Sequence, residues 1–228
     1  SVVVISVILP TLNEADNLPE TLASLKALNA PLEITVVDAG STDATVSLAE
    51  ACGALVIHSE KRQRAHQLNV GAAAATGDVL WFLHADTWVK QGAAESIVVA
   101  LRNSVVVGGG FKRRFRSASP LLAFTCWIAS LRSRWCGLFF GDQSIFVRKA
   151  VFEQVGGFAD VPVFEDFDFC QKAKEVGKMR SVGPAVRSSA RRFQKRGVLT
   201  VVLQDLWLTW RYHRGESPEL ILKRIRRG

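Results

Sequence analysis

Short apolar runs alternate with helix-like segments over the first hundred residues of this 228-residue chain. Runs of this kind, rich in β-branched side chains and bounded by polar residues, are typical of strands buried on both faces of a sheet. Strands that alternate with helices form βαβ units, so we expect an α/β fold with a mostly parallel central sheet flanked by helices. The expected strands span residues 2–9, 32–37, 54–58 and 78–83, and the expected helices span residues 16–28, 45–52 and 62–75.

The pattern becomes less regular after residue 105, where a glycine-rich strand precedes an apolar segment, a strand at 144–147 and further helices. Upstream, Asp16 is the expected cap of the first helix, with Pro19 in its first turn. The apolar segment 121–135 has near-helical spacing, which favours burial in the core; contact with a membrane surface is the alternative. Its stripe consists of Leu121, Leu122, Phe124, Trp127, Ile128, Leu131 and Trp135.

Polar residues follow each of the first four expected strands. Because the carboxyl ends of parallel strands meet at one edge of a sheet, these residues are expected to line a common crevice, where open α/β sheets bind their ligands. Each strand end alone is weak support, since every strand must end somewhere. The polar residues are Asn13, Glu14, Asp38, Asp43, Arg62, Arg64, His84 and Asp86.

The chain lacks the glycine-rich phosphate-binding signatures G-x-G-x-x-G after its first strand and G-x-x-x-x-G-K-[ST] anywhere. A nucleotide would therefore need another counter-charge for its phosphates. A carboxylate at a strand end suits a divalent cation that bridges two phosphates, and Asp86 fits this role. Arg62 or Arg64 could supply further positive charge, and Asp38 could accept a hydrogen bond from a base.

Five segments together resemble the family-2 glycosyltransferases of the GT-A fold, most closely the subgroup of radical-SAM/selenodomain-associated transferases. They read PTLNEADNL, VVDAGSTDAT, WFLHADT, GDQSIFVRKAVFEQVGGF and FEDFDF, and the resemblance extends in order to about Arg192. It implies one GT-A domain over residues 1–228. Within it, residues 1–104 would form the nucleotide-sugar-binding half, 105–190 the acceptor and catalytic half, and 191–228 a basic helical segment.

The resemblance implies a nucleotide-diphosphate sugar as donor. Asp38 would then contact the base, the loop from Thr11 to Glu14 would line the nucleoside, and Asp86 would hold Mn²⁺ or Mg²⁺. Many relatives carry Asp-x-Asp at this motif, whereas this chain has His84; a coordinating imidazole would favour manganese. The implied donor-binding residues are Pro10, Thr11, Asn13, Glu14, Asp38, Gly40, Arg62, Arg64, His84, Ala85 and Asp86.

The acidic motif at residues 165–168 lies among phenylalanines. A carboxylate in apolar surroundings is poised to act as a general base, and by resemblance Asp166 is the first candidate and Glu165 the second. The alternative is that these acids only stabilise a helix N-terminus. The expected acceptor-side residues, each with a purely structural alternative, are Gly141, Asp142, Gln143, Arg191 and Arg192.

The net charge of +8 is concentrated near the end of the chain, because residues 191–228 hold ten Lys or Arg against three Asp or Glu. Such a segment can face anionic lipid, nucleic acid or water; the acidic crevice argues against nucleic acid. Four widely spaced cysteines indicate reduced thiols, and no apolar run is long enough to cross a bilayer. We expect a cytoplasmic protein, with peripheral association at the inner face of the membrane as an open alternative.

The hypothesis that accounts for most of these features is a metal-dependent inverting glycosyltransferase that uses an acceptor hydroxyl from a small molecule or a lipid. A nucleotidyltransferase on a related sheet is a second hypothesis, weakened by the absence of glycine from the first loop. A non-catalytic basic module that binds membrane or nucleic acid is a third. It explains the basic segment but leaves the acidic crevice unexplained.

Overall fold

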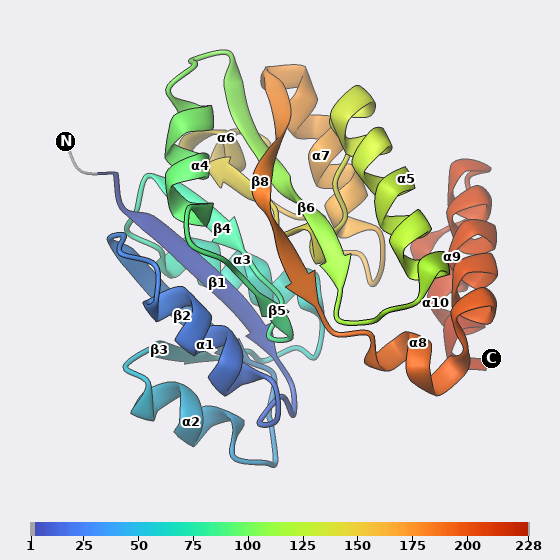
Figure 1. Cartoon of the computed structure of the whole chain (residues 1–228), viewed down its shortest axis with the longest axis horizontal. Helices are drawn as coiled ribbons and strands as arrows, with labels where there is room; N and C mark the ends of the chain where they lie inside the picture. Colours follow the sequence, from blue (N-terminus) through green and yellow to red (C-terminus); the bar gives the residue numbers. More distant parts are fainter. Residues whose placement is uncertain (1–2, 228) are drawn as a thin grey trace.

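An eight-stranded sheet forms the centre of the molecule (Figure 1). The computed structural model describes residues 3–227, apart from the side chains at positions 192, 195, 213, 226 and 227. The strand order is β3-β2-β1-β4-β7-β6-β8-β5. The strands are β1 Ile5–Thr11, β2 Leu32–Asp38, β3 Leu55–His58, β4 Val79–Phe82, β5 Thr87–Trp88, β6 Val106–Phe115, β7 Phe146–Arg148 and β8 Lys178–Ser188.

The first four strands are mutually parallel, as predicted: β1 lies between β2 and β4, and β2 pairs with β3. Their carboxyl ends therefore share one edge of the sheet. The second half of the sheet is mixed, because β7 is antiparallel to both β4 and β6, whereas β6 and β8 are parallel. The α/β class and the mostly parallel sheet are confirmed.

Helices cover both faces of the sheet, in agreement with strands that are apolar on both sides. Along β4, Trp81 packs on the face covered by α1 and α4, whereas Leu80 and Phe82 pack on the face covered by α3, α6 and α7. The helices are α1 Leu18–Lys26, α2 Thr45–Ala51, α3 Arg64–Ala74, α4 Ala93–Leu101, α5 Pro120–Cys136, α6 Lys149–Gln154, α7 Glu165–Val176, α8 Arg191–Arg196, α9 Val198–His213 and α10 Pro218–Arg227, with a 3₁₀ turn η1 at Gly141–Gln143.

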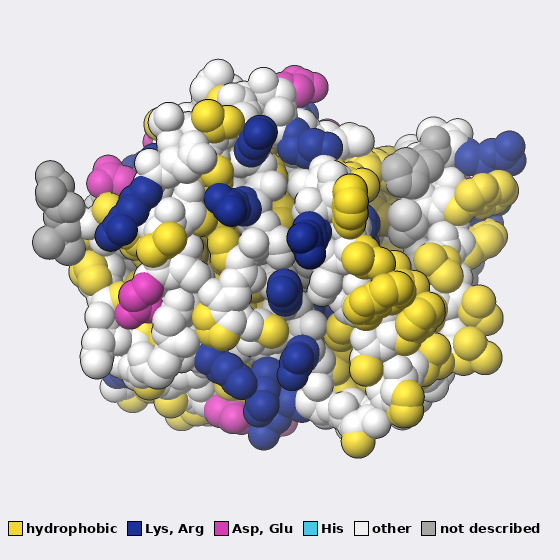
Figure 2. All heavy atoms as spheres, turned by 45° about the horizontal axis from the view of Figure 1, so that its top comes forward, with side chains coloured by type: hydrophobic (Ala, Val, Ile, Leu, Met, Phe, Trp, Pro, Cys, Tyr) yellow, Lys and Arg dark blue, Asp and Glu magenta, His cyan; other side chains and the backbone are white. Residues whose placement is uncertain are grey.

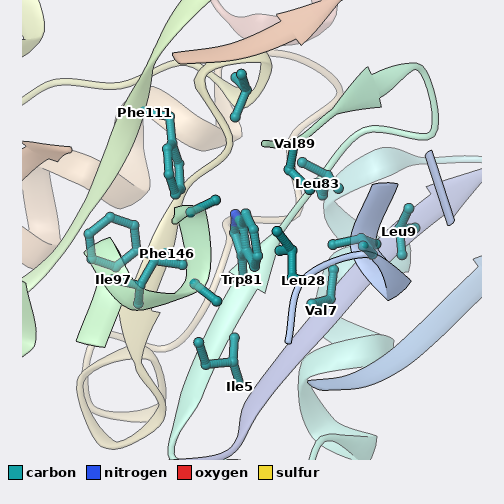
Figure 3. Close-up of a cluster of buried hydrophobic side chains, with 14 of the residues drawn as sticks. Ile5, Val7, Leu9, Leu28, Trp81, Leu83, Val89, Ile97, Phe111 and Phe146 are labelled. Atoms are coloured by element: carbon teal, nitrogen blue, oxygen red, sulfur yellow. The ribbon is translucent and has the colours of Figure 1, made fainter. Parts of the chain in front are cut away.

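Trp81 occupies the centre of the first of these cores (Figure 3). Its ring stacks on Phe111 of β6 with centroids 5.5 Å apart, and Phe111 in turn meets Phe146 of β7 edge to face. The indole Nε1 donates a hydrogen bond of 2.7 Å to Ser144 Oγ, so the polar atom of a fully buried side chain has a partner. These contacts join the parallel half of the sheet to its mixed half.

One expectation about the elements needs correction, and two elements, β8 and α4, were not predicted. The first helix begins at Leu18 after Asn17, and Asp16 is exposed in the preceding turn rather than at the cap position. Strand β8 was not predicted, because its buried positions are interrupted by arginines and by Gly183-Pro184, which hides a period of two. Helix α4 was also missed.

The apolar stripe predicted for the core on α5 faces solvent for the most part. The helix buries Leu122, Cys126, Ala129 and Ser133 at i, i+4, i+7 and i+11. These mostly small side chains let α5 lie close to β6, while the large apolar side chains on its other faces are exposed. Periodicity located the helix correctly but assigned the wrong face, because apolar residues occur all around it.

We expect Trp81→Ala to lower the free energy of unfolding by about 3–5 kcal/mol, because it leaves a cavity and removes the partner of Ser144. Chemical denaturation monitored by circular dichroism measures the change. Trp135→Ala is the matched control, since that indole is 81% exposed and its loss should alter stability by less than about 0.5 kcal/mol. Equal effects of the two changes would contradict the assignment of Trp81 to the core.

Candidate active site

Two loops at the carboxyl edge of the sheet, one after β1 and one after β2, are held together by the carboxylate of Asp38. Its Oδ1 accepts hydrogen bonds from the hydroxyls of Thr11 at 3.0 Å and Ser41 at 2.5 Å. Its Oδ2 accepts from the backbone amides of Gly40 and Ser41 at 2.9 and 2.8 Å. Burial alone would raise the pKa of Asp38, but these four hydrogen bonds outweigh it and hold the pKa below its usual value. Asp38 is therefore a carboxylate that shapes the loop.

The loop after β1 is also bonded directly to the loop after β2. Asn13, at a positive φ of 54°, accepts a hydrogen bond from the amide of Thr42 at 2.8 Å, and its own amide donates to Ser41. The amide of Glu14 donates to Thr45 Oγ1 at 2.9 Å. The two loops thus form one rigid wall, as expected if both line one ligand.

Gln67 on α3 fixes the position of these two loops through hydrogen bonds to the strands that precede them. The sequence did not predict this role. Its buried amide donates to the carbonyl oxygens of Thr11 and Val37 at 3.0 and 2.8 Å. The side chain thereby joins the ends of β1 and β2. A glutamine within a helical pattern gives no sequence signal of such a role, because the partners are backbone atoms of distant segments.

Asp86 lies near Glu14 and Arg191, residues that arrive from opposite ends of the chain. Burial and the charge of Glu14 raise the pKa of Asp86, and the charge of Arg191 opposes this rise. Arg191 Nη2 is 3.4 Å from Glu14 Oε1. Arg191 was predicted on the acceptor side; the structure places it beside Glu14 and Asp86, at the loops that follow β1 and β4.

The carboxylate oxygens of Asp86 and Glu14 fit a hard divalent cation that takes most of its ligands from a bound molecule and from water. Within residues 3–227, no group of three or more His, Cys, Asp or Glu side chains is arranged to hold a metal. Burial and the charge of Glu14 disfavour the ionised form of Asp86, and a cation would stabilise that form; Mg²⁺ or Mn²⁺ bound to phosphates needs only one or two protein ligands. The two carboxylates therefore fit a metal ion that binds together with a diphosphate.

Arg64, the first residue of α3, lies at the centre of a second cluster. Its Nε is 2.5 Å from Glu165 Oε1, its Nη2 is 3.6 Å from Asp166 Oδ2, and its Nη1 is 3.1 Å from His84 Nε2. Sequence reasoning assigned Arg64 to the phosphates of a donor. In the structure its guanidinium pairs with the two acids that begin α7.

Asp166 is a buried carboxylate whose charge is incompletely compensated. Burial and the neighbouring charge of Glu165 raise its pKa above the usual value, and this outweighs the opposing effect of Arg64. Its Oδ2 accepts a hydrogen bond from the amide of Gly141 at 2.6 Å, and its Oδ1 accepts from the amide of Phe167 at 2.8 Å. These contacts fix the orientation of a group that readily takes up a proton.

His84 belongs to the Arg64 cluster rather than to the position of Asp86. Burial and the charge of Arg64 lower the pKa of His84 to about 3, so the imidazole is neutral. A neutral ring with Arg64 Nη1 at 3.1 Å accepts the hydrogen bond through Nε2. That nitrogen is thus committed to Arg64, which argues against metal coordination through Nε2.

The η1 turn connects the two acids at the start of α7 to helix α5. Gly141 faces Asp166 and leaves no room for a side chain, since a Cβ there would lie 2.7 Å from His84 Nε2. Asp142 pairs with Arg113 of β6, and Gln143 accepts a hydrogen bond of 2.7 Å from Arg132 of α5. Asp142 and Gln143, predicted on the acceptor side, therefore anchor the turn.

The other predicted site residues are placed as follows. Pro10 lies within β1, and Ala85 is buried with its carbonyl accepting a hydrogen bond from Thr21. Gly40 has a positive φ of 85° and lies beside the exposed Arg62, whose Nη2 is 3.5 Å from the Gly40 carbonyl oxygen. The side chain of Arg192 lies outside the described residues.

The raised pKa of Asp166 makes a prediction about stability. Between the usual aspartate pKa of about 4 and the raised value, the folded protein binds a proton that the unfolded chain does not. Stability should therefore fall as pH rises through this window, and Asp166→Asn should remove the part of the fall that is due to Asp166, leaving the part that is due to Asp86. Urea unfolding at a series of pH values measures it, with Asp160→Asn on an exposed loop as control. A wild-type to Asp166→Asn difference that does not vary with pH would refute the assignment.

Comparisons with known proteins show the family to which this chain belongs. A PGL/p-HBAD biosynthesis glycosyltransferase of Mycobacterium bovis (strain BCG) is 30% identical over 182 residues, covering 72% of this chain and 67% of that protein. The mannosyltransferase PcManGT from Pyrobaculum calidifontis, solved with GDP-Man and Mn²⁺, is 26% identical with a TM-score of 0.64. S. aureus TarS 1–349, solved with UDP-GlcNAc, is 19% identical with a TM-score of 0.67.

This chain corresponds to only a little more than half of each of these two solved chains. It is matched over 81% of its length in both, yet spans 56% of the mannosyltransferase chain and 58% of the TarS chain. Residues 6–133, which include the loops after β1 and β2 and the His84-x-Asp86 motif, match the description Glycosyl transferase family 2. The chain is a glycosyltransferase with the GT-A fold and belongs to glycosyl transferase family 2.

Proposed function

We propose that the protein transfers a sugar from a nucleotide-diphosphate donor to an acceptor hydroxyl, with inversion at the anomeric carbon and with a divalent metal. The observation that carries this proposal is Asp166, a buried carboxylate with a raised pKa that is oriented by Gly141 and Phe167. It lies at the same edge of the sheet as the two nucleoside loops. A base and a nucleotide wall on one edge are the two parts that a displacement at a nucleotide sugar requires.

The donor side is formed by the joined loops after β1 and β2. PcManGT and TarS are solved with GDP-Man and UDP-GlcNAc, which supports a nucleotide sugar as the ligand here. Asp38 already accepts four hydrogen bonds, so its contribution to base recognition is chiefly to hold the shape of the loop. A base that donates the predicted hydrogen bond to Asp38 would have to compete with the four donors that this carboxylate already has.

Asp86 is the residue we assign to the metal, with Glu14 beside it. A bound Mn²⁺ or Mg²⁺ would neutralise the negative charge that develops on the departing diphosphate. Arg191 lies close enough to Glu14 to add positive charge on the same side. The protein's own part is to hold two carboxylates and one guanidinium in a fixed arrangement before the donor arrives.

The transfer step uses Asp166. The acceptor oxygen attacks the anomeric carbon, the bond from that carbon to the diphosphate oxygen breaks, and the acceptor proton passes to the carboxylate. Because one displacement occurs on the face opposite the leaving group, the configuration inverts. Arg64 is bonded to Glu165, which orients the beginning of α7, and its charge keeps Asp166 from becoming protonated too readily.

We propose three further features of this protein. They are the resemblance to the radical-SAM/selenodomain-associated subgroup, the division of residues 1–228 into donor, acceptor and C-terminal parts, and a cytoplasmic location. A thermal-shift panel of nucleoside diphosphates and nucleotide sugars with Mn²⁺ identifies the donor, because a ligand that binds the folded state raises the melting temperature.

We expect Asp166→Asn to lower turnover by about 10²–10⁴ while leaving donor affinity unchanged, because the amide keeps the shape but cannot accept the proton. Release of nucleoside diphosphate from the donor found by the panel measures turnover, and calorimetry measures affinity. Asp168→Asn is the matched control, since Asp168 lies in the same helical turn and pairs with Lys172. Wild-type turnover in Asp166→Asn would remove it as the base and favour Glu165.

We expect Asp86→Ala to abolish the Mn²⁺-dependent part of nucleoside diphosphate binding while the melting temperature without ligand stays close to that of the wild type. The side chain contributes a carboxylate and packs little apolar surface, so its loss removes the cation ligand. Calorimetry with and without Mn²⁺ provides the measurement. Asp160→Ala, in an exposed ion pair with Lys61, controls for loss of charge. If Asp86→Ala kept the Mn²⁺-dependent affinity for nucleoside diphosphate, the assignment of Asp86 as a metal ligand would be wrong.

A further inference from the structure

Helices α5 and α9 expose an unusual amount of apolar surface. On each helix the exposed large side chains follow helical spacing and form one stripe, whereas folded monomers usually scatter such residues singly. Arg113 lies between the two helices, because its charge interacts with Cys126 of α5 and Asp205 of α9. We call these stripes the apolar face: Leu121, Phe124, Trp127, Ile128, Leu131 and Trp135 on α5, and Leu199, Leu203, Leu206, Trp207 and Trp210 on α9.

Four tryptophans belong to the apolar face, and this residue type has a specific preference. Trp127 and Trp135 are 58% and 81% exposed on α5, and Trp207 and Trp210 are 42% and 50% exposed on α9. Indole rings favour the boundary between lipid tails and headgroups, since their flat apolar bodies carry one polar N–H. Arg214 stacks on Trp210 at 4.7 Å, which places a cation directly beside an exposed indole.

Three of the elements around the apolar face are basic and contain no acid. Strands β6 and β8 and helix α5 together hold eight Lys or Arg and no Asp or Glu. Arg114 of β6 lies opposite Arg187 of β8 in the strand register, and both are exposed, so two like charges are neighbours. Figure 2 shows the hydrophobic side chains gathered over one side of the molecule, with a row of Lys and Arg next to them.

The acid on α9 does not change this picture. Asp205 is partly buried, and its charge acts on Arg113 beneath the helices. Glu216, which follows α9, is engaged by Arg211 and Arg224. Glu219 on α10 is exposed, but Lys223 and Arg224 of the same helix are exposed as well. The surface presented outward by the apolar face and its surroundings is therefore mainly apolar and cationic.

We propose that the apolar face docks this protein onto the surface of an anionic lipid bilayer. Apolar side chains would enter the headgroup region while the neighbouring arginines meet lipid phosphates. A second copy of the chain is a poorer occupant, because a two-fold contact would bring the basic residues of both copies together. Insertion would be peripheral: among residues 3–227 no helix is long and apolar enough to cross a bilayer.

Docking in this way would bring the acceptor side of the site to the lipid surface. Arg132 of α5 bonds Gln143 in the η1 turn, which contacts Asp166 through Gly141. On α9, Tyr212 stacks on Phe164, the residue before Glu165, with centroids 4.5 Å apart. Helix α9 thus contacts the residue that precedes the two acids, and α5 contacts the turn that is hydrogen-bonded to Asp166.

The test is vesicle co-sedimentation, without donor or acceptor, so its outcome does not depend on glycosyl transfer. We expect binding to phosphatidylcholine vesicles that contain phosphatidylglycerol, weaker binding to phosphatidylcholine alone, and a steep decrease with salt. Trp127→Ser combined with Trp135→Ser should weaken binding at least about tenfold. Arg114→Gln and Arg187→Gln should each weaken it about fivefold, and only on anionic vesicles.

Matched controls come from the opposite parts of the molecule. Val99→Ser and Leu55→Ser remove exposed apolar side chains from α4 and β3, and Arg102→Gln removes an exposed charge; all three should bind vesicles like the wild type. Melting temperatures verify that each variant folds. Absence of wild-type binding to anionic vesicles at low salt would overturn the proposal. So would wild-type binding by the double tryptophan variant, or a dimer in sedimentation velocity that this variant abolishes.

Discussion

The guanidinium of Arg64 joins three elements of the fold at the carboxyl edge of the sheet. It begins α3 and contacts Glu165 at the beginning of α7 and His84 after β4. A cation at a helix N-terminus is disfavoured by the helix dipole, whereas acids at the start of α7 are favoured by it. The pairing offsets the first effect. With Glu165 and Asp166 both beside one arginine, however, the cluster retains excess negative charge. Burial, together with this excess charge, is why Asp166 holds a proton more tightly than an ordinary aspartate.

The first half of the fold could be predicted because its signals are local. Strands β1 to β4 are apolar on both faces, and the polar residues that follow them lie at one edge, as parallel pairing requires. The second half depends on contacts that no local pattern records. Strand β8 is recognisable only through its pairing with β6, and α5 is apolar all round, so that close packing of Cys126 and Ala129 decides which side is buried.

The site shows the same division. Asp38, Glu14 and Asp86 were identified from strand ends, and the structure places all three at the edge expected. The contact of Arg191 with Glu14 spans 177 positions, and sequence spacing cannot reveal it. His84 and Asp86 would share a face if β4 continued, but the strand ends at Phe82, and the two side chains diverge to different clusters. The alternation of a strand does not extend into the loop that follows it.

The C-terminal segment is consequently part of the site rather than a basic appendage. Its first residue, Arg191, lies beside Glu14, and Tyr212 near the end of α9 stacks on Phe164 and meets Phe167 edge to face. Phe164 has a positive φ of 65°, a strained backbone that persists only where its surroundings hold it. Since Phe164 immediately precedes the two acids, the stack with Tyr212 holds the start of α7 in place. The position of Asp166 therefore depends on α9, which also carries half of the apolar face.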